Sequence, residues 1–308
     1  MAVHTDISQL KGISRPIVTI GTFDGVHAGH KAILSKVVTY AREVGGESVL
    51  LTFEPHPRKV LFPTQPLGII TPLQRKTELI AATGIQHIVV VPFTKEFAAL
   101  SAEDYIKNVL VDPLRPHTII IGYDHHFGHD RTGNIDLLRR YAPTYGYNIV
   151  EIPAQLIDQA TVSSTKIRKA ILAGHIAEAN TMLGREYTLE GTVVHGKKLG
   201  RELGYPTANI APLNADQVVP GIGIYAVRVR IDNVLYGGMM SIGLNPTVSH
   251  TQDVKLEVNI FDIDADLYGQ VLEIGFADRL RNEQKFSSLE ELIAQLHADK
   301  AAAMAALG

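Results

Sequence analysis

The stretch PIVTIGTFDGVHAGH, residues 16–30, determines the first part of the fold. It begins with a short apolar run, residues 16–22, that contains a glycine near its end, which is typical of a β-strand. Residues 31–44 then show helical apolar spacing, and two glycines follow them. Where a strand meets a helix in this way, free backbone N–H groups and the helix dipole can bind a phosphate. The stretch therefore predicts a strand–loop–helix unit with an anion site at residues 21–30.

The same alternation continues through the first half of the chain. Strand-like runs cover residues 48–53, 87–92, 117–122 and 147–153. Helices are expected from an N-cap at Thr71, with Pro72 first in the helix, up to Gly84, at 105–110 behind a Ser101/Asp104 capping box, and at 134–141. Continuous apolar strands that alternate with helices indicate a parallel sheet covered on both faces. We therefore expect a doubly wound α/β domain, which binds ligands beyond the carboxyl ends of its strands.

The second half has a different pattern. Strands are expected at residues 225–231, 234–244, 255–263 and 271–280, without a helix between them, and an amphipathic helix at 288–307. Such strands form antiparallel pairs, so we expect a small antiparallel β-barrel with a C-terminal helix. A helix that begins at Ser164 precedes the join, which lies near residues 174–187. The expected domains are residues 1–185 and 186–308.

The composition excludes several classes of protein. The chain has 308 residues and no cysteine, which excludes disulfide scaffolds, thiolate metal sites and a cysteine nucleophile. No apolar run approaches the ~18 residues of a membrane span, and the N-terminus lacks a secretory signal pattern, so we expect a cytoplasmic protein with no membrane partner. Residues 1–185 carry a net charge of +3 and residues 186–308 one of −6. The two halves therefore differ in chemistry as well as in pattern.

The loop at residues 21–30 carries two histidines within one helical turn. His27 and His30 can face the same ligand, while Gly25 and Gly29 let the backbone approach closely. Two imidazoles beside a helix N-terminus can stabilise charge on a phosphoryl group during transfer. A metal site is an alternative for this histidine pair, although no carboxylate or third histidine lies at ligand spacing on this helix.

A second motif, GKKLGRELGYPTAN at residues 196–209, is a basic, glycine-rich loop in an otherwise acidic domain. It is a candidate phosphate cradle, but it lacks the P-loop pattern and so excludes an ordinary P-loop kinase. Thr207 and Asn209 alternate after a proline, so their side chains share one face, and both offer oxygens suited to Mg²⁺ and phosphate. A turn with a polar strand edge is the alternative for this segment.

Together with further motifs, these two stretches resemble bacterial bifunctional riboflavin kinase/FMN adenylyltransferases, whose first domain is a Rossmann-like nucleotidyltransferase with an HxGH motif. The matching blocks are GTFDGVHAGH (21–30), FEPHP (53–57), GYDHHFG (122–128), SSTKIR (163–168), GKKLGRELGYPTAN (196–209), GIYA (223–226) and IGLNPT (242–247). Three positions depart from the family pattern. The family usually has an aromatic residue at His125, asparagine at Ser241 and histidine at Asn259.

The resemblance implies that the first domain transfers an adenylyl group from ATP to FMN. The residues implied to bind ATP or its phosphates there are Gly21, Phe23, Asp24, His27, His30, Asp124, Arg131, Ser164, Thr165 and Arg168, with His27 and His30 catalytic. The nucleophile of this reaction comes from the substrate, which is consistent with the absence of cysteine.

The resemblance implies that the second domain phosphorylates riboflavin, with Glu257 as the base on the ribityl 5′-hydroxyl. The residues implied to bind ATP or flavin are Gly196, Lys197, Gly200, Arg201, Gly204, Pro206, Thr207 and Asn209, of which Thr207 and Asn209 would hold Mg²⁺ with ATP. The partners are then riboflavin, FMN, FAD and ATP/ADP, with ATP as co-substrate and no tightly bound prosthetic group required. The sequence indicates no oligomeric state.

Two other hypotheses concern the barrel. It could be a flavin-sensing module without activity, although the intact PTAN segment and Glu257 argue against this. It could be a nucleic-acid binder of the OB type, although its net charge of −6 and the absence of tryptophan argue against that. We therefore expect no nucleic-acid partner.

Overall fold

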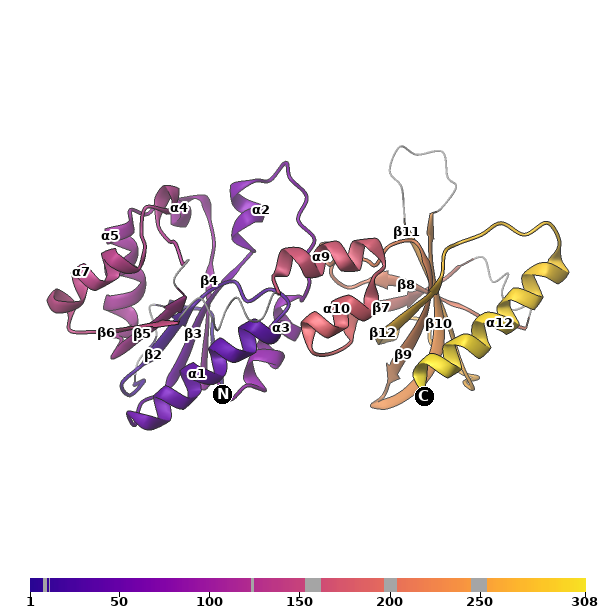
Figure 1. Ribbon diagram of the computed structural model, residues 1–308, viewed down its shortest axis with the longest axis horizontal. Coiled ribbons are helices and arrows are strands. Elements are labelled where there is room, and N and C mark those ends of the chain that lie inside the picture. The colour runs from indigo at the N-terminus through magenta and orange to yellow at the C-terminus, as the bar shows by residue number, and fades with distance from the viewer. Residues whose placement is uncertain (8–9, 11, 123–124, 153–161, 197–203, 245–253) are drawn as a thin grey trace. The chain divides into compact units, whose positions relative to one another are not determined.

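A computed structural model describes residues 1–7, 10, 12–122, 125–152, 162–196, 204–244 and 254–308 of the chain (Figure 1). Contacts within the chain divide it into two compact units, Met1–Ser164 and Thr165–Gly308. None of the helices formed by these residues has the length and apolar character needed to cross a lipid bilayer.

The first unit contains a six-stranded sheet in the order β1-β4-β3-β2-β5-β6, in which every pair of neighbouring strands is parallel. The strands are β1 (Ala2–His4), β2 (Ile17–Ile20), β3 (Ser48–Glu54), β4 (His87–Pro92), β5 (Thr118–Gly122) and β6 (Asn148–Ile152). The helices are α1 (Ala28–Glu43), α2 (Pro57–Leu61), α3 (Leu73–Ala81), α4 (Lys95–Ala98), α5 (Ala102–Asp104), the π-helix η2 (Tyr105–Val111), α6 (Asp112–Leu114), the 3₁₀-helix η3 (His129–Arg131) and α7 (Ile135–Tyr145).

Apolar cores cover both faces of this sheet, as the sequence predicts for a doubly wound fold. Successive residues of β3 alternate between them, since Leu50 packs with α1 and α3 whereas Val49 and Leu51 pack with η2 and α7. The chain order of the strands reverses between β2 and β5. In open α/β sheets this switch point opens a crevice at the carboxyl ends of the strands, and the loop after β2 lies there.

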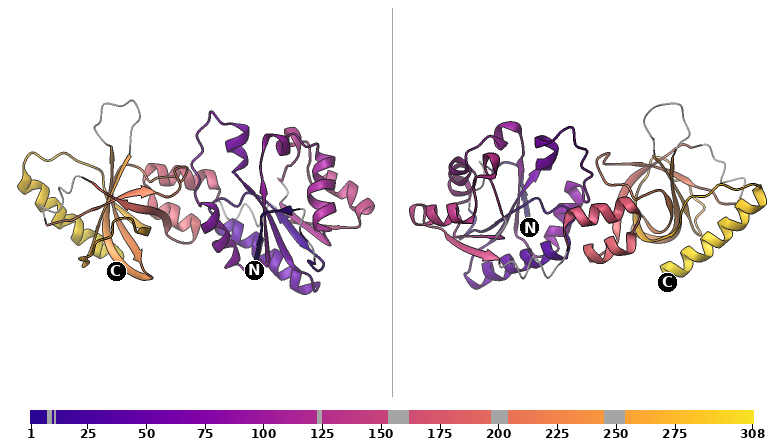
Figure 2. Two further views of the ribbon diagram at one scale, coloured as in Figure 1. Left: turned by 180° about the vertical axis from the view of Figure 1, so that it is seen from behind. Right: turned by 45° about the horizontal axis from the view of Figure 1, so that its top comes forward.

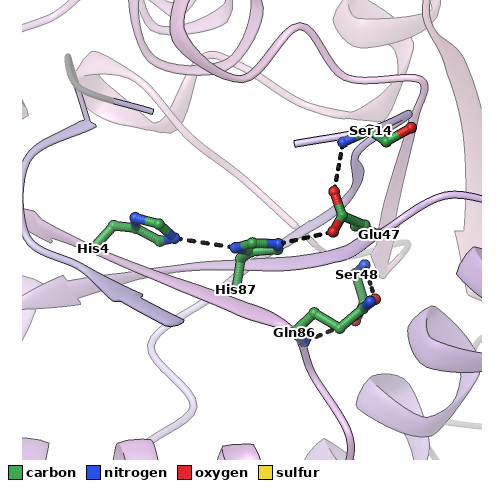
Figure 3. A network of polar contacts seen from close by, with 6 residues as sticks. All are labelled: His4, Ser14, Glu47, Ser48, Gln86 and His87. Carbon is green, nitrogen blue, oxygen red and sulfur yellow. Dashed lines mark hydrogen bonds and ion pairs between the residues drawn. The ribbon is translucent and has the colours of Figure 1, made fainter. Parts of the chain in front are cut away.

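The edge strand β1 is an element that the sequence did not indicate. It pairs in parallel with β4, and Figure 3 shows the polar contacts beside it. His4 Nε2 lies 3.1 Å from His87 Nδ1, and His87 Nε2 lies 3.5 Å from Glu47 Oε1. The backbone N–H of Ser14 donates to Glu47 Oε2 at 2.5 Å. These contacts join the short strand and the segment before β2 to the body of the sheet.

Two local predictions are corrected by the structure. Thr71 does not cap α3, because Pro72 is the N-cap residue and its end lacks a side-chain cap hydrogen bond. Ser101 caps the next helical segment as expected, accepting from the N–H of Asp104 at 3.0 Å. The helix beyond it, η2, is a π-helix rather than an α-helix. Apolar spacing over two turns does not distinguish these hydrogen-bond patterns, so the sequence could not predict it.

The second unit contains a closed barrel with the strand order β10-β11-β8-β7-β12-β9, and every neighbouring pair with a described register is antiparallel. The strands are β7 (Tyr187–Val194), β8 (Ala208–Pro212), β9 (Gly223–Ile231), β10 (Val234–Leu244), β11 (Val254–Ile260) and β12 (Val271–Arg281). The C-terminal helix α12 (Leu289–Leu307) lies alongside β9, β10 and β12 (Figure 2). The expected antiparallel barrel with a C-terminal helix is thereby confirmed.

Helices α9 (Ser164–Ala173) and α10 (Ile176–Leu183) precede the barrel in the chain, and α10 packs against β12 and β7. The amide of Asn180 donates to Phe276 O at 2.8 Å and accepts from the N–H of Tyr187 at 2.7 Å. The backbone N–H of Gly221 donates to Ile171 O at 3.1 Å. The contacts therefore separate the units at residues 164/165, while a functional boundary at residue 185 stays a prediction.

Candidate functional site

The loop between β2 and α1 adopts a strained backbone at the switch point of the sheet. Phe23, Gly25 and Val26 have φ angles of 49°, 91° and 41°, in the left-handed region that β-branched valine rarely occupies. The buried carboxylate of Asp24 accepts hydrogen bonds from the N–H groups of Ile70 and Thr71, with its Oδ1 at 3.0 and 3.1 Å from them. Asp24 therefore holds the loop from within, and strain of this kind persists where the surroundings fix the backbone.

The two histidines of the loop form a stacked pair. Their ring centroids are 3.6 Å apart and their planes are inclined by 20°. His27 is the N-cap residue of α1, and its Nδ1 accepts from the N–H of His30 at 3.4 Å. The pair therefore lies at the positive end of the α1 dipole, where a phosphoryl group would find donors and a favourable field.

The imidazole of His30 is held in its neutral form. Burial lowers the pKa of His30 well below its usual 6.5, and the charges of His27 and Lys76 lower it further. Its Nδ1 is buried without a hydrogen-bond partner, and the centroids of the His30 and Phe23 rings are 4.9 Å apart. A neutral imidazole with a free nitrogen can donate or accept one hydrogen bond to an incoming phosphoryl oxygen.

Gly21 and Phe23 fit closely together at the start of the loop. A Cβ on Gly21 would lie 2.8 Å from the Phe23 ring, so glycine is required there, and Phe23 itself belongs to the buried core. The hydroxyl of Ser164, the last residue of the first unit, donates to the carbonyl of Asp24 at 2.9 Å. Arg131, in η3, is exposed. Thus Gly21, Phe23, Asp24 and Ser164 gather around the histidine pair.

Three further residues are implied for adenylyl transfer, namely Asp124, Thr165 and Arg168. Thr165 is exposed and Arg168 is buried, and both lie on α9 within the second unit. Asp124 lies outside the described residues. Lys76 of α3, which the sequence analysis did not single out, is buried close to the loop. Its signal in the sequence is a lysine on the face of α3 that also carries Ile80, the other buried residue of that helix.

The barrel holds a cavity of about 270 Å³ that opens between its strands and α12. The apolar part of its lining is made by Ile224, Met239, Met240, Phe286, Leu292 and Leu296. The polar part includes Thr207, Ser241, Lys255, Glu257, Asn259 and Asp299. The cavity thus combines a large apolar wall with one row of polar groups, which is the usual make-up of a site for a small organic ligand.

Glu257 projects from β11 into this cavity, beside Lys255 on the same face of the strand. Lys255 Nζ lies 2.8 Å from Glu257 Oε1. In the sheet register Glu257 is opposite Asn209 of β8 on one side and Ser241 of β10 on the other. The candidate base and a candidate metal ligand are therefore neighbours on two adjacent strands.

The segment before β8 is fixed by two close approaches. Asn259 Nδ2 donates to Pro206 O at 2.7 Å, which ties this segment to the strand of Glu257. A Cβ on Gly196 would lie 2.0 Å from Asn209 Nδ2, so the backbone at Gly196 rests directly against that side chain. Thr207 lines the cavity.

The structure describes only some of the other residues implied for the kinase site. Gly204 has a φ of 77°, a conformation that favours glycine. Lys197, Gly200 and Arg201 lie outside the described residues.

Polar contacts hold α12 as one wall of the cavity. Arg281 and Asp299 form a two-point ion pair, with Nε–Oδ1 and Nη2–Oδ2 distances of 2.8 and 2.7 Å. Gln295 also donates to Asp299 Oδ1 at 2.8 Å, and the Tyr205 hydroxyl lies 2.6 Å from His297 Nδ1. The sequence predicted an apolar face on this helix, and Leu292 and Leu296 of that face line the cavity, while the fully buried residues of the helix are Asp299 and Ala303.

Comparisons with known proteins agree with the two-part organisation. The family model of FAD synthetase matches residues 11–166, and that of riboflavin kinase matches residues 183–307. A solved structure described as a macrolide-efflux protein from Streptococcus pneumoniae has 31% sequence identity and a TM-score of 0.88, with 98% of each chain covered. That description applies to the pneumococcal protein alone.

Two sequence relatives are named bifunctional riboflavin kinase/FMN adenylyltransferase. The relative from Listeria monocytogenes is 38% identical, with 92% of this chain and 90% of the relative covered. The relative from Buchnera aphidicola (Acyrthosiphon pisum) is 37% identical, with 97% and 96% covered. The chain belongs to the family of bifunctional riboflavin kinase/FMN adenylyltransferases, with the FAD synthetase part first and the riboflavin kinase part second.

Proposed function

We propose that the chain makes FAD from riboflavin in two steps, with FMN formed in the barrel and adenylylated at the loop between β2 and α1. For the first unit, the observation that supports this most is the stacked His27–His30 pair at the N-terminus of α1. For the second unit, it is Glu257 in the cavity, opposite Asn209. Both reactions consume ATP, which favours the cytoplasm as the site of activity.

In adenylyl transfer, an oxygen of the 5′-phosphate of FMN attacks the α-phosphorus of ATP, and the bond to pyrophosphate breaks. His27 and His30 donate hydrogen bonds to the phosphoryl oxygens as charge develops on them, and the α1 dipole adds to this stabilisation. Gly21 and Phe23 shape the loop, and Asp24 holds it in place. The residues further proposed to bind ATP are Asp124, Arg131, Ser164, Thr165 and Arg168.

In the kinase reaction, the ribityl 5′-hydroxyl of riboflavin attacks the γ-phosphorus of ATP, and ADP leaves. Glu257 takes the proton from this hydroxyl, and Lys255 orients its carboxylate through the 2.8 Å ion pair. The apolar lining of the cavity receives the ring system of the flavin. The residues proposed to bind ATP are Gly196, Lys197, Gly200, Arg201, Gly204, Pro206, Thr207 and Asn209.

Thr207 and Asn209 would hold Mg²⁺ together with the phosphates of ATP. Their hydroxyl and amide oxygens suit this ion, which uses few protein ligands when it binds with a nucleotide. Across the described part of the chain, no cluster of three or more His, Cys, Asp or Glu side chains is placed to hold a metal, so a site shared with ATP fits better than an all-protein cage. When bound, the ion would neutralise charge on the transferred phosphoryl group.

The two assignments are tested by separating FMN from FAD after incubation of the full chain with riboflavin, ATP and Mg²⁺. We expect His27→Ala to form FMN and stop there. We expect Thr207→Ala to form no FMN but to convert supplied FMN to FAD. Loss of both activities in either folded variant would refute the assignment of one reaction to each unit.

A further inference from the structure

Lys76 is a buried cation beside the loop that carries the histidine pair. Its side chain is 5% exposed, and its Nζ lies 3.4 Å from both the carbonyl of Thr22 and the hydroxyl of Thr52, and 3.5 Å from the carbonyl of Phe53. These oxygens lie just beyond β2 and near the end of β3. Lys76 is therefore placed at the carboxyl ends of the central strands, where ligands bind in this fold.

The charge of Lys76 is incompletely compensated by its neighbours. Charge-assisted N–H···O bonds are usually about 2.7–2.9 Å long, shorter than all three of these contacts. None of the ion pairs found within the described residues includes Lys76, and the negative groups that act on it from farther away are Glu54 and Asp24. Burial accordingly lowers the pKa of its ammonium group. Since an unpaired buried charge costs free energy, stability alone does not account for this lysine.

We propose that Lys76 is a positioning residue for adenylyl transfer, which fixes the chain where the loop leaves β2 and places a positive charge close to the His27–His30 pair. The proposal rests on the catalytic roles given above to the two histidines. Lys76 acts on them from α3, without contact to the reacting atoms.

The stacking of the histidines explains what this charge does. With ring centroids 3.6 Å apart, two charged imidazoles would repel each other strongly, so the stacked arrangement requires a neutral ring. The groups that lower the pKa of His30 by their charge are His27 on α1 and Lys76 on α3. Burial is the main cause of the lowered pKa of His30, and the charge of Lys76 adds to it, so Lys76 favours the neutral form of His30 and with it the stacked arrangement.

The test uses the full chain with Lys76→Met, which removes the ammonium group and keeps an unbranched side chain. Arg75→Met is the matched control, because Arg75 lies next to it on α3 and pairs with Glu78. Histidine titration is followed by NMR with labelled histidine, with His30→Gln used to assign the signal. We expect the pKa of His30 to rise in Lys76→Met and to stay unchanged in Arg75→Met.

Activity is measured on the same samples. We expect the acid limb of FMN adenylyltransferase kcat/KM to move to higher pH in Lys76→Met, with a loss of roughly 10- to 100-fold on that limb. Riboflavin kinase activity should stay unchanged. An unchanged His30 titration would overturn the proposal whatever the activity. A shifted titration with an unmoved activity profile would instead refute the catalytic role of His30, and the positioning role with it.

Discussion

The ion pair between Arg281 and Asp299 gives the sharpest quantitative prediction for the kinase unit. Asp299 is 3% exposed, and the side chain of Arg281 is 19% exposed. Replacing Asp299 by alanine removes both contacts of the guanidinium with a carboxylate and the acceptor for Gln295, and leaves only the bond from Arg281 to the carbonyl of Asn282. The substitution leaves a largely buried positive charge without a negative partner, which is more costly than losing a hydrogen bond.

The size of the expected loss of stability in Asp299→Ala follows from the burial of the ion pair. Breaking a buried ion pair by removing one partner costs about 3–5 kcal/mol, and the partial exposure of Arg281 favours the lower end. At about 2–4 °C per kcal/mol for a unit of this size, a loss of about 3 kcal/mol lowers the Tm of the kinase unit by roughly 6–12 °C. Leu292 and Leu296 lie on the same helix and line the cavity, so the KM for riboflavin should rise as well.

The assay combines calorimetry of the full chain with both enzyme activities. Asp299→Ala should weaken riboflavin phosphorylation and leave adenylylation of supplied FMN unchanged. Gln295→Ala, which removes the hydrogen bond to Asp299 and the one accepted from Gln284, should cost only about 1–2 kcal/mol. The double variant Arg281→Met/Asp299→Leu, with apolar replacements, should be more stable than Asp299→Ala. If Asp299→Ala unfolds at the wild-type temperature, the pair does not hold α12 against the barrel.

Two further predictions concern Gly196 and His30. In Gly196→Ala the new Cβ would lie 2.0 Å from Asn209 Nδ2 and displace that side chain. We therefore expect the KM for MgATP in the kinase reaction to rise, with little change in Tm. An unchanged KM would show that Asn209 does not contribute to ATP binding. The pKa of His30 is lowered from 6.5, so the unfolded chain binds more protons and the free energy of unfolding falls as pH drops below about 6.5. Urea unfolding should show a weaker pH dependence between about pH 7 and pH 5 for His30→Gln, and equal slopes would contradict the buried, neutral state of His30.

The regular elements were predictable where the local pattern was long and consistent. Strand β10 (Val234–Leu244) and strand β4 (His87–Pro92) lie where the apolar runs and their flanking turns predicted. Strand β1 has only three residues, too few for a period to emerge, and it is held by pairing with β4 and the contacts of His4. Strand β7 was not predicted either, although its residues alternate between buried and partly buried positions. It directly follows helix α10, at the join between the two parts of the chain.

The candidate sites were predictable as motifs but not as arrangements. The sequence places Glu257 and Asn209 on separate strands, and only the register between β8 and β11 makes them neighbours. The contact of Asn259 depends on the same pairing of strands, since its amide donates to Pro206 O in the segment before β8. Lys76 could not be assigned because a lysine in a helical pattern is usually exposed, and its burial depends on the ends of two distant strands.

Each unit contains a buried charge, but the charge has an ionic partner in the barrel and only neutral hydrogen-bond partners in the α/β unit. This difference predicts how substitutions change stability and activity. In the barrel, Arg281 and Asp299 satisfy each other at two points, so the pair secures a wall of the cavity and its loss lowers stability first. In the α/β unit, Lys76 is buried with only long contacts to neutral oxygens, so its removal relieves part of a desolvation cost. Lys76→Met should therefore weaken adenylyl transfer on the acid limb of its pH profile without losing stability, whereas Asp299→Ala should lower stability and kinase activity together. The ion pair of Arg281 and Asp299 therefore stabilises the barrel, whereas the role proposed for the charge of Lys76 lies in adenylyl transfer.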